Sequence, residues 1–204
     1  MGQSVLNKEI SRIYGNGRGW VFTPKDFADL GARTSIDVGL HTLVAQNKIR
    51  RIGRGLYDYP KESKLLNKTL SPDYFLVAEA VARKNGWKIV PSGETILNKL
   101  RLSTQISSQY IFDSDGENST VTVNDTKIMF RKAPLKDIGI KSKKGIFLVR
   151  AIKTLGKDRV NDKVIEVMKQ AVSAKECKTI LKETKIVTGW VYNIIQKVCK
   201  ECLK

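Results

Sequence analysis

The sequence predicts an α+β protein built from two domains. Short helical segments and a basic β-hairpin account for the first sixty residues, and a break containing proline and lysine follows them. Beyond the break, β-prone runs give way to helical periodicity from Lys144 onward. We therefore divide the 204-residue chain into a first domain at residues 1–60, a linker at 61–72 and a second domain at 73–204.

The first domain is expected to begin with a helix over residues 5–13, which ends before the glycine-rich segment 15–19. A second helix is predicted over residues 24–30. Thr23 is its expected N-cap, and Asp26 completes a Thr-x-x-Asp capping box. The rings of Phe22 and Phe27 stand at the positions of a hydrophobic staple.

A third helix is predicted to begin at Thr34 or Ser35 and to end near Asn47. Its apolar stripe has helical spacing and consists of Ile36, Leu40, Leu43 and Val44. Two β-prone runs between residues 49 and 59 then flank a Gly-Arg-Gly turn, which is typical of a hairpin. The order of two short helices, a turn between them and a basic hairpin predicts a winged helix-turn-helix.

In such a domain the second helix of the pair enters the major groove of DNA, and the hairpin follows phosphates or the minor groove. Polar and small side chains lie off the apolar stripe. Among them, Asp37 is expected to orient Arg33 or to accept a hydrogen bond from the amino group of a cytosine. Arg54, between two glycines, is the strongest candidate for a wing contact. The full set of predicted DNA-binding residues is Arg33, Thr34, Ser35, Val38, His41, Thr42, Lys48, Arg50, Arg51 and Arg54.

The linker is expected to contain at most a helical turn at Leu65 and Leu66. The second domain is predicted to be a mixed α/β domain with antiparallel strands and a helical C-terminal tail, and residues 113–116 are predicted to form a turn. Its expected helices are 74–82, 92–100, 145–155, 162–174, 174–182 and 187–203, and its expected strands are 88–90, 109–112, 119–123 and 127–131.

Two segments also resemble a known family. Residues 14–24, Tyr-Gly-Asn-Gly-Arg-Gly-Trp-Val-Phe-Thr-Pro, and residues 48–60, Lys-Ile-Arg-Arg-Ile-Gly-Arg-Gly-Leu-Tyr-Asp-Tyr-Pro, are similar to the N-terminal region of the AbiEi-like antitoxins. These belong to bacterial type IV toxin–antitoxin and phage-abortive systems. The resemblance implies a winged-helix repressor of its own operon. We expect such a repressor to bind inverted half-sites in its own promoter, as a homodimer on the DNA. The resemblance also implies a second domain that counteracts a neighbouring nucleotidyltransferase toxin, without requiring a stable complex.

The formal net charge of +17 indicates a polyanionic partner. Only +4 of this charge lies in residues 1–60, and the remaining +13 lies beyond them. The basic second domain is expected to extend the DNA footprint, to face an acidic partner, or simply to be a solvated lysine-rich surface. No run of about 18 apolar residues predicts a membrane span, and the expected compartment is the cytoplasm.

Catalytic and metal chemistry are not expected. The single histidine, His41, stands on the predicted recognition helix, so no Ser-His-Asp or Cys-His set is available. Cys199 and Cys202 form a Cys-x-x-Cys pair at a helix end, where helix packing is a better interpretation than a zinc or redox site. We expect neither a cofactor nor a bound metal nor an enzyme. The alternative functions are a stand-alone winged-helix regulator and a protein-interaction module.

Overall fold

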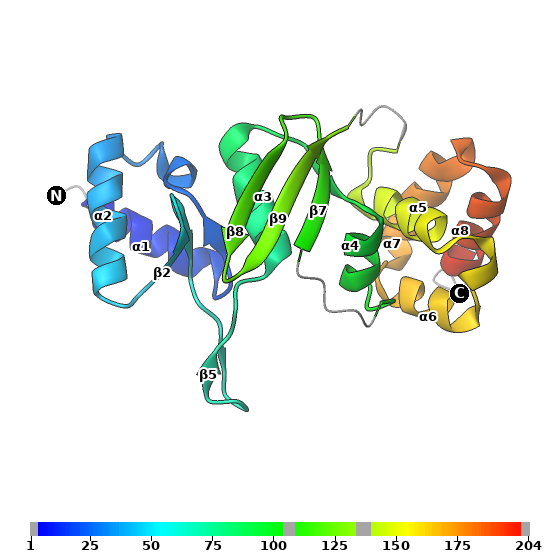
Figure 1. Ribbon diagram of the computed structural model, residues 1–204, viewed down its shortest axis with the longest axis horizontal. Helices are drawn as coiled ribbons and strands as arrows, with labels where there is room; N and C mark the ends of the chain where they lie inside the picture. The colour runs from blue at the N-terminus through cyan, green and yellow to red at the C-terminus, as the bar shows by residue number, and fades with distance from the viewer. Residues whose placement is uncertain (1–3, 104–108, 134–139, 201–204) are drawn as a thin grey trace. The chain divides into compact units, whose positions relative to one another are not determined.

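A computed structural model describes residues 4–103, 109–133 and 140–200. The chain is α+β, as predicted, with antiparallel sheets and a helical C-terminal part (Figure 1). It divides into two compact units. The first comprises residues 1–88 and 120–128, and the second comprises residues 89–119 and 129–204. This division differs from the expected boundary at residue 60.

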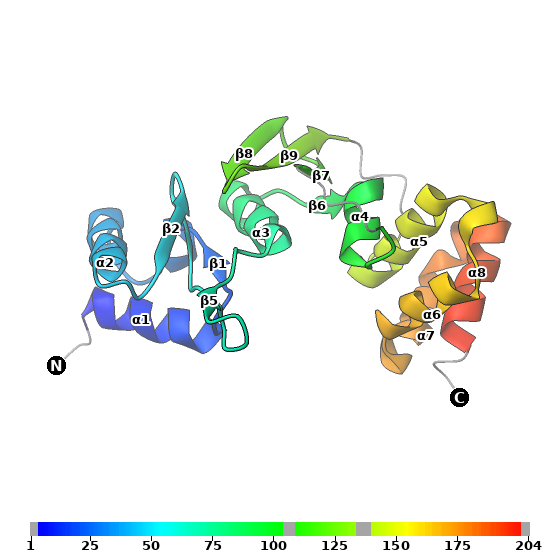
Figure 2. The same ribbon diagram turned by 60° about the horizontal axis from the view of Figure 1, so that its bottom comes forward.

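The first unit contains α1 (Val5–Asn16), β1 (Val21–Phe22), the 3-10 helix η1 (Pro24–Phe27), α2 (Arg33–Ala45), β2 (Arg50–Gly53) and β3 (Leu56–Asp58). The three strands form one antiparallel sheet in the order β1-β3-β2. Figure 2 shows α1 and α2 beside this sheet. This order of elements is compatible with a winged helix-turn-helix.

The second predicted helix is wrong in type and length, because residues 24–27 form a single 3-10 turn. The predicted capping interaction is present, since the Asp26 carboxylate accepts a hydrogen bond of 2.8 Å from the Thr23 amide. The predicted staple is also confirmed, with the Phe22 and Phe27 ring centroids 5.4 Å apart. The cap and the staple fix the entry into the turn, and residues 28–32 then lead without a regular helix to α2.

The core of the first unit joins its helices to its sheet. The predicted stripe of α2 supplies Ile36, Leu40 and Leu43, which are buried. The Trp20 ring centroid lies 4.6 Å from that of Phe22 in a tilted arrangement and 5.8 Å from that of Phe27, so the three rings form one cluster. The fully buried or nearly buried members of the core are Ile13, Phe22, Phe27, Ile36, Leu40, Leu43 and Ile49.

Residues 61–70 form a β-hairpin rather than a helical turn, and we call them the arm. Its strands β4 (Glu62–Ser63) and β5 (Lys68–Thr69) pair antiparallel. Leu65 and Leu66 therefore lie in the turn of a hairpin, and the predicted helical turn is wrong. Asn67 has a positive φ of 45°, which closes this turn in a conformation that asparagine tolerates.

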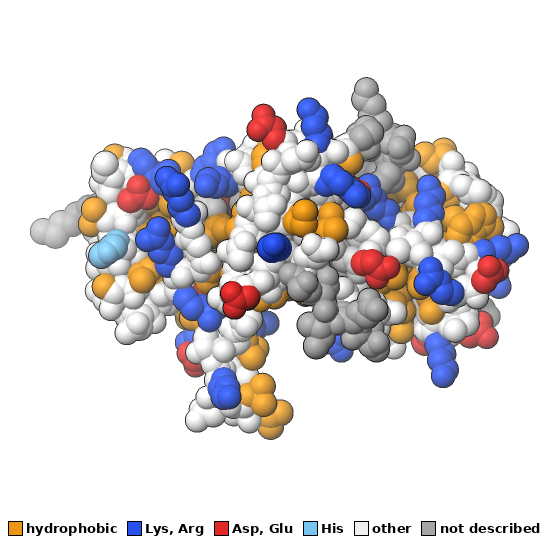
Figure 3. Space-filling view, viewed as in Figure 1, with side chains coloured by type: hydrophobic (Ala, Val, Ile, Leu, Met, Phe, Trp, Pro, Cys, Tyr) orange, Lys and Arg blue, Asp and Glu red, His pale blue; other side chains and the backbone are white. Residues whose placement is uncertain are grey.

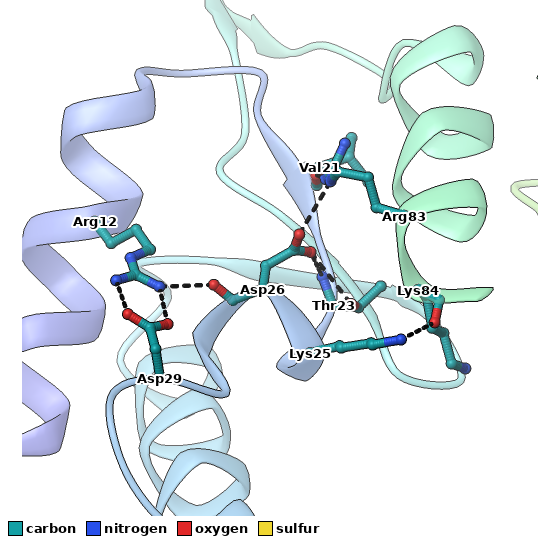
Figure 4. A network of polar contacts seen from close by, with 8 residues as sticks. All are labelled: Arg12, Val21, Thr23, Lys25, Asp26, Asp29, Arg83 and Lys84. Carbon is teal, nitrogen blue, oxygen red and sulfur yellow. Dashed lines mark hydrogen bonds and ion pairs between the residues drawn. The ribbon is translucent and has the colours of Figure 1, made fainter. Parts of the chain in front are cut away.

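Helix α3 (Tyr74–Asn85) belongs to the first unit, although the sequence assigns it to the second domain. Arg83 donates hydrogen bonds to the Asp26 carboxylate at 3.0 Å and to the Val21 carbonyl at 2.8 Å. The Lys25 ammonium donates to the Lys84 carbonyl at 2.9 Å (Figure 4). These bonds attach α3 to η1 and β1.

The remaining strands are β6 (Ile89–Pro91), β7 (Gln109–Ser114), β8 (Ser119–Val123) and β9 (Thr126–Lys132), in the sheet order β6-β7-β9-β8. The predicted turn at residues 113–116 begins later than expected, because Asp113 and Ser114 still belong to β7. Asp113 is buried there and accepts from Arg131 at 2.8 Å and from Arg150 at 2.5 Å. This carboxylate thus links two strands to the helix that carries Arg150.

Within its described residues, the second unit has the helices α4 (Gly93–Lys99), α5 (Lys143–Leu155), α6 (Asp162–Gln170), α7 (Ala174–Glu183) and α8 (Gly189–Lys200), and the 3-10 turns η3 (Lys157–Arg159) and η4 (Thr184–Ile186). All five helices were predicted within a few residues. Cys177 and Cys199 are buried in the core between them, as helix packing predicts. Cys202 lies outside the described residues.

Candidate nucleic-acid interface

One face of α2 is exposed along its whole length. Thr34, Ser35, Val38 and His41 are exposed, and Thr42 is half-buried with its hydroxyl donating to the Val38 carbonyl at 2.9 Å. Val38 is 67% exposed, which is unusual for a branched apolar side chain in the middle of an amphipathic helix. The sequence correctly separated this face from the buried stripe.

The only acidic residue of α2 is neutralised on the same helix. Asp37 accepts from the Arg33 guanidinium, with 2.9 Å from Nε to each carboxylate oxygen. The two residues are four apart, which places them on one side of the helix. The predicted contact between Asp37 and Arg33 is confirmed. The rest of the exposed face carries no acidic side chain.

Helix α2 packs closely against α1 at Gly39. A side chain at this position would collide with the Glu9 carboxylate, so the glycine leaves the space that Glu9 fills. Glu9 is 0% exposed, and among the described residues neither of its carboxylate oxygens has a hydrogen-bond partner. Burial, reinforced by the negative charge of Asp37, raises the pKa of Glu9 to about 7. A carboxyl group that favours its protonated form thus lies under the exposed helix.

The hairpin of β2 and β3 presents a basic surface. Lys48, Arg51 and Arg54 are exposed, and within residues 4–103, 109–133 and 140–200 none of them forms an ion pair. Gly55 has a φ of +66°, which the tight turn after Arg54 requires. In Figure 3, Lys and Arg side chains gather over the end of the molecule where α2 and β2 lie.

Arg50 differs from the other predicted contacts. Its guanidinium makes two bonds to the buried Asp58 carboxylate, at 3.0 and 2.6 Å, and a third to the Leu70 carbonyl at 3.0 Å. The hydrogen bonds that Arg50 donates to the Asp58 carboxylate raise the pKa of Arg50. This side chain joins β2 to β3 and to the arm, and we leave it out of the proposed DNA contacts.

Arginine side chains neutralise every acidic residue between positions 26 and 62. The distances between donor nitrogen and carboxylate oxygen range from 2.6 to 3.1 Å. Figure 4 shows two of these pairs, Arg12 with Asp29 and Arg83 with Asp26. The hydrogen bond from Arg12 lowers the pKa of Asp29 to about 2. The five pairs are Arg83–Asp26, Arg12–Asp29, Arg33–Asp37, Arg50–Asp58 and Arg18–Glu62.

Two cations near α2 were missed by sequence reasoning. An open hollow of about 440 Å³ lies at the N-terminal end of α2, and its lining includes Lys25, Arg33, Gly55 and Lys84. Lys25 comes from η1 and Lys84 from the end of α3. Only the packing of α3 on η1 brings Lys84 there, and nothing in the local sequence signals it.

Comparison with known proteins places the chain in one family. The model of a family of unknown function, DUF6088, matches residues 8–181. The chain belongs to the DUF6088 family. A search of curated proteins found no match to it.

The DUF6088 match begins in α1 and ends in α7, so it includes the exposed face of α2, the β2–β3 hairpin and the arm. The family description names no function. Over the described parts of this DUF6088 chain, no group of three or more His, Cys, Asp or Glu side chains is arranged to hold a metal ion. No described helix combines the length and the apolar character needed to cross a bilayer.

Proposed function

We propose that the protein is a transcription regulator that binds duplex DNA through α2 and the β2–β3 wing. One observation carries the proposal. The exposed face of α2 has its single acidic side chain paired with Arg33, and it stands beside wing cations that form no ion pair among the described residues. A surface whose acidic side chain is paired and whose cations are not is suited to binding a polyanion. A face that only contacts water would need no such arrangement.

The chemistry of each group suggests its role. Ser35 and His41 offer hydrogen bonds to base edges, and Val38 offers an apolar contact to a thymine methyl group. Lys48, Arg51 and Arg54 are suited to phosphates, because their long side chains are exposed. The site of action is the protein's own promoter, bound as a dimer on inverted repeats, and the compartment is the bacterial cytoplasm. The resemblance to AbiEi-like antitoxins supports these last points.

The wing is tested by the salt dependence of binding. Fluorescence anisotropy would compare a labelled duplex from upstream of the gene with a shuffled duplex of the same composition. Arg54→Ala is expected to weaken binding to both duplexes alike, and to reduce the slope of log K against log salt concentration by about 0.9, since one phosphate contact is lost. Lys163→Ala, an exposed cation of α6, is the matched control and should leave the slope unchanged. An unchanged slope for Arg54→Ala and for Arg51→Ala would remove the wing from the interface.

We also propose that the second unit counteracts a nucleotidyltransferase toxin encoded beside the gene. The resemblance to AbiEi-like antitoxins supports this proposal. When the toxin and the full-length protein are co-expressed from unrelated promoters, growth is expected to be restored. Arg51→Ala/Arg54→Ala should restore growth equally, because promoter binding is not needed there. Continued growth arrest with folded wild-type protein would favour the stand-alone regulator, and co-purification of the two proteins would favour an interaction module.

A further inference from the structure

The arm, residues 61–70, has an apolar tip. Leu65 is 93% exposed and Leu66 is 60% exposed. Leu65 is the most exposed large apolar side chain in the part of the chain that the structure describes. The turn is ordered by local bonds, from the Leu66 amide to the Ser63 hydroxyl at 3.2 Å and from the Leu70 amide to the Lys61 carbonyl at 2.8 Å. The leucines are therefore exposed in the turn of a formed hairpin, whose backbone is labelled at β5 in Figures 1 and 2.

The apolar tip is surrounded by positive charge. Lys61, Lys64 and Lys68 are all exposed, and Lys64 directly precedes the leucine pair. The one acidic residue of the arm, Glu62, accepts an ion pair from Arg18 at 3.1 Å. The arm thus combines three lysines with an apolar tip, and the charge of its only acidic residue is neutralised by Arg18.

The base of the arm is tied to the sheet that carries the wing. Arg18 donates to the Pro60 carbonyl at 2.9 Å and lies 4.8 Å from the Tyr59 ring centroid. Arg50, on strand β2, donates to the Leu70 carbonyl at 3.0 Å. Both strands of the arm therefore start from groups fixed on the first unit, which also carries α2.

We propose that the arm is a second DNA contact, in which the three lysines neutralise phosphates and Leu65 wedges between base pairs in the minor groove. This inference rests on the proposed function. A two-stranded β-ribbon is narrow enough to follow a groove of DNA, and leucine is among the side chains that architectural proteins insert between base steps. Insertion unstacks the step and kinks the duplex by about 20–90°.

Charge favours DNA over a second copy of the chain. Two arms that met tip to tip would bring three lysines against three lysines. Two leucine side chains also provide far less area than the roughly 1,200 Å² that a stable protein interface buries. A DNA duplex offers a partner to both kinds of side chain at the tip, because its phosphates can pair with the lysines and its base steps can take the inserted leucine.

The test uses the full-length protein and one promoter duplex that carries a dye at each end. Affinity is measured by anisotropy, and bending by the change in energy transfer between the dyes. Leu65→Ser/Leu66→Ser is expected to lose the bend and about tenfold in affinity, with an unchanged salt slope. Lys61→Gln/Lys64→Gln/Lys68→Gln should lower the salt slope by about 2.7. Ile186→Ser, at a side chain that is 71% exposed in η4, is the matched control and should change neither quantity.

The outcomes separate this proposal from the proposed function. If the leucine variant binds and bends the duplex as the wild type does, while Arg54→Ala still lowers the salt slope, the arm is not a DNA contact and only the wing remains one. If wild-type protein shows no promoter binding, the proposed function fails first. If the leucine variant instead changes the sedimentation of the free protein, or its binding to anionic vesicles, with promoter binding and bending intact, the tip serves another partner and the proposal is wrong.

Discussion

Val38→Asp is expected to lower the affinity for promoter DNA by about 100-fold or more. The substitution removes an apolar contact and places a negative charge on the exposed face of α2, among the phosphates of the bound duplex. A 100-fold loss corresponds to about 2.7 kcal/mol of binding free energy. Fluorescence anisotropy at fixed salt concentration measures the effect, and Val38→Ala should lose far less because it adds no charge.

Ile186→Asp is the control for charge and exposure. Ile186 is 71% exposed, close to the 67% of Val38, and it lies in the second unit. Both variants lower the net charge by one and bury no new polar group. Equal losses of affinity in the two variants would attribute the effect to overall charge, and would remove α2 from the interface. The fold of Val38→Asp should persist, since aspartate costs less than about 1 kcal/mol at an exposed helix position.

Glu9→Gln is expected to stabilise the protein at pH 8 but hardly at pH 4.5. The pKa of Glu9 rises from an ordinary value of 4.5 to about 7 on folding, so the native state binds more protons than the unfolded state between these values. Stability from this group is therefore complete below pH 4.5 and is lost as the pH rises to about 7. The full loss is about 3 kcal/mol, and the neutral amide avoids it.

Urea denaturation of both proteins at pH 4.5, 6, 7 and 8 gives the difference in unfolding free energy directly, because other titrating groups contribute equally to each protein. The difference should grow up to pH 7 and then level off. Asp29→Asn is the matched control. The pKa of Asp29 is held near 2 by Arg12, so its difference from wild type should be constant over this range. A constant difference for Glu9→Gln would show that Glu9 does not titrate in the native state.

Sequence patterns predicted what depends on neighbours along the chain. The stripe of Ile36, Leu40 and Leu43 identified both faces of α2, and the Phe22–Phe27 staple was found from spacing alone. In each case the interacting residues are at most seven positions apart. Periodicity and capping encode such contacts directly.

Contacts between distant residues escaped prediction. Arg83 reaches Asp26 across 57 positions, and Arg50 reaches Leu70 across 20. Glu9 appears in the sequence as an ordinary surface charge after Lys8, and only the absence of a side chain at Gly39 makes room for its burial. Tertiary packing thus decided which charges face solvent, and the set of candidate residues near α2 changed accordingly, with Arg50 removed and Lys25 and Lys84 added.

The division into two units has a consequence for how this protein can be inherited and engineered. The chain passes from one unit to the other at residues 88–89, 119–120 and 128–129. No single cut separates the units, so neither can be exchanged by joining gene segments end to end. A hybrid in which one unit comes from another protein would need three junctions chosen together. The family match, from residue 8 to residue 181, includes all three crossings between the units.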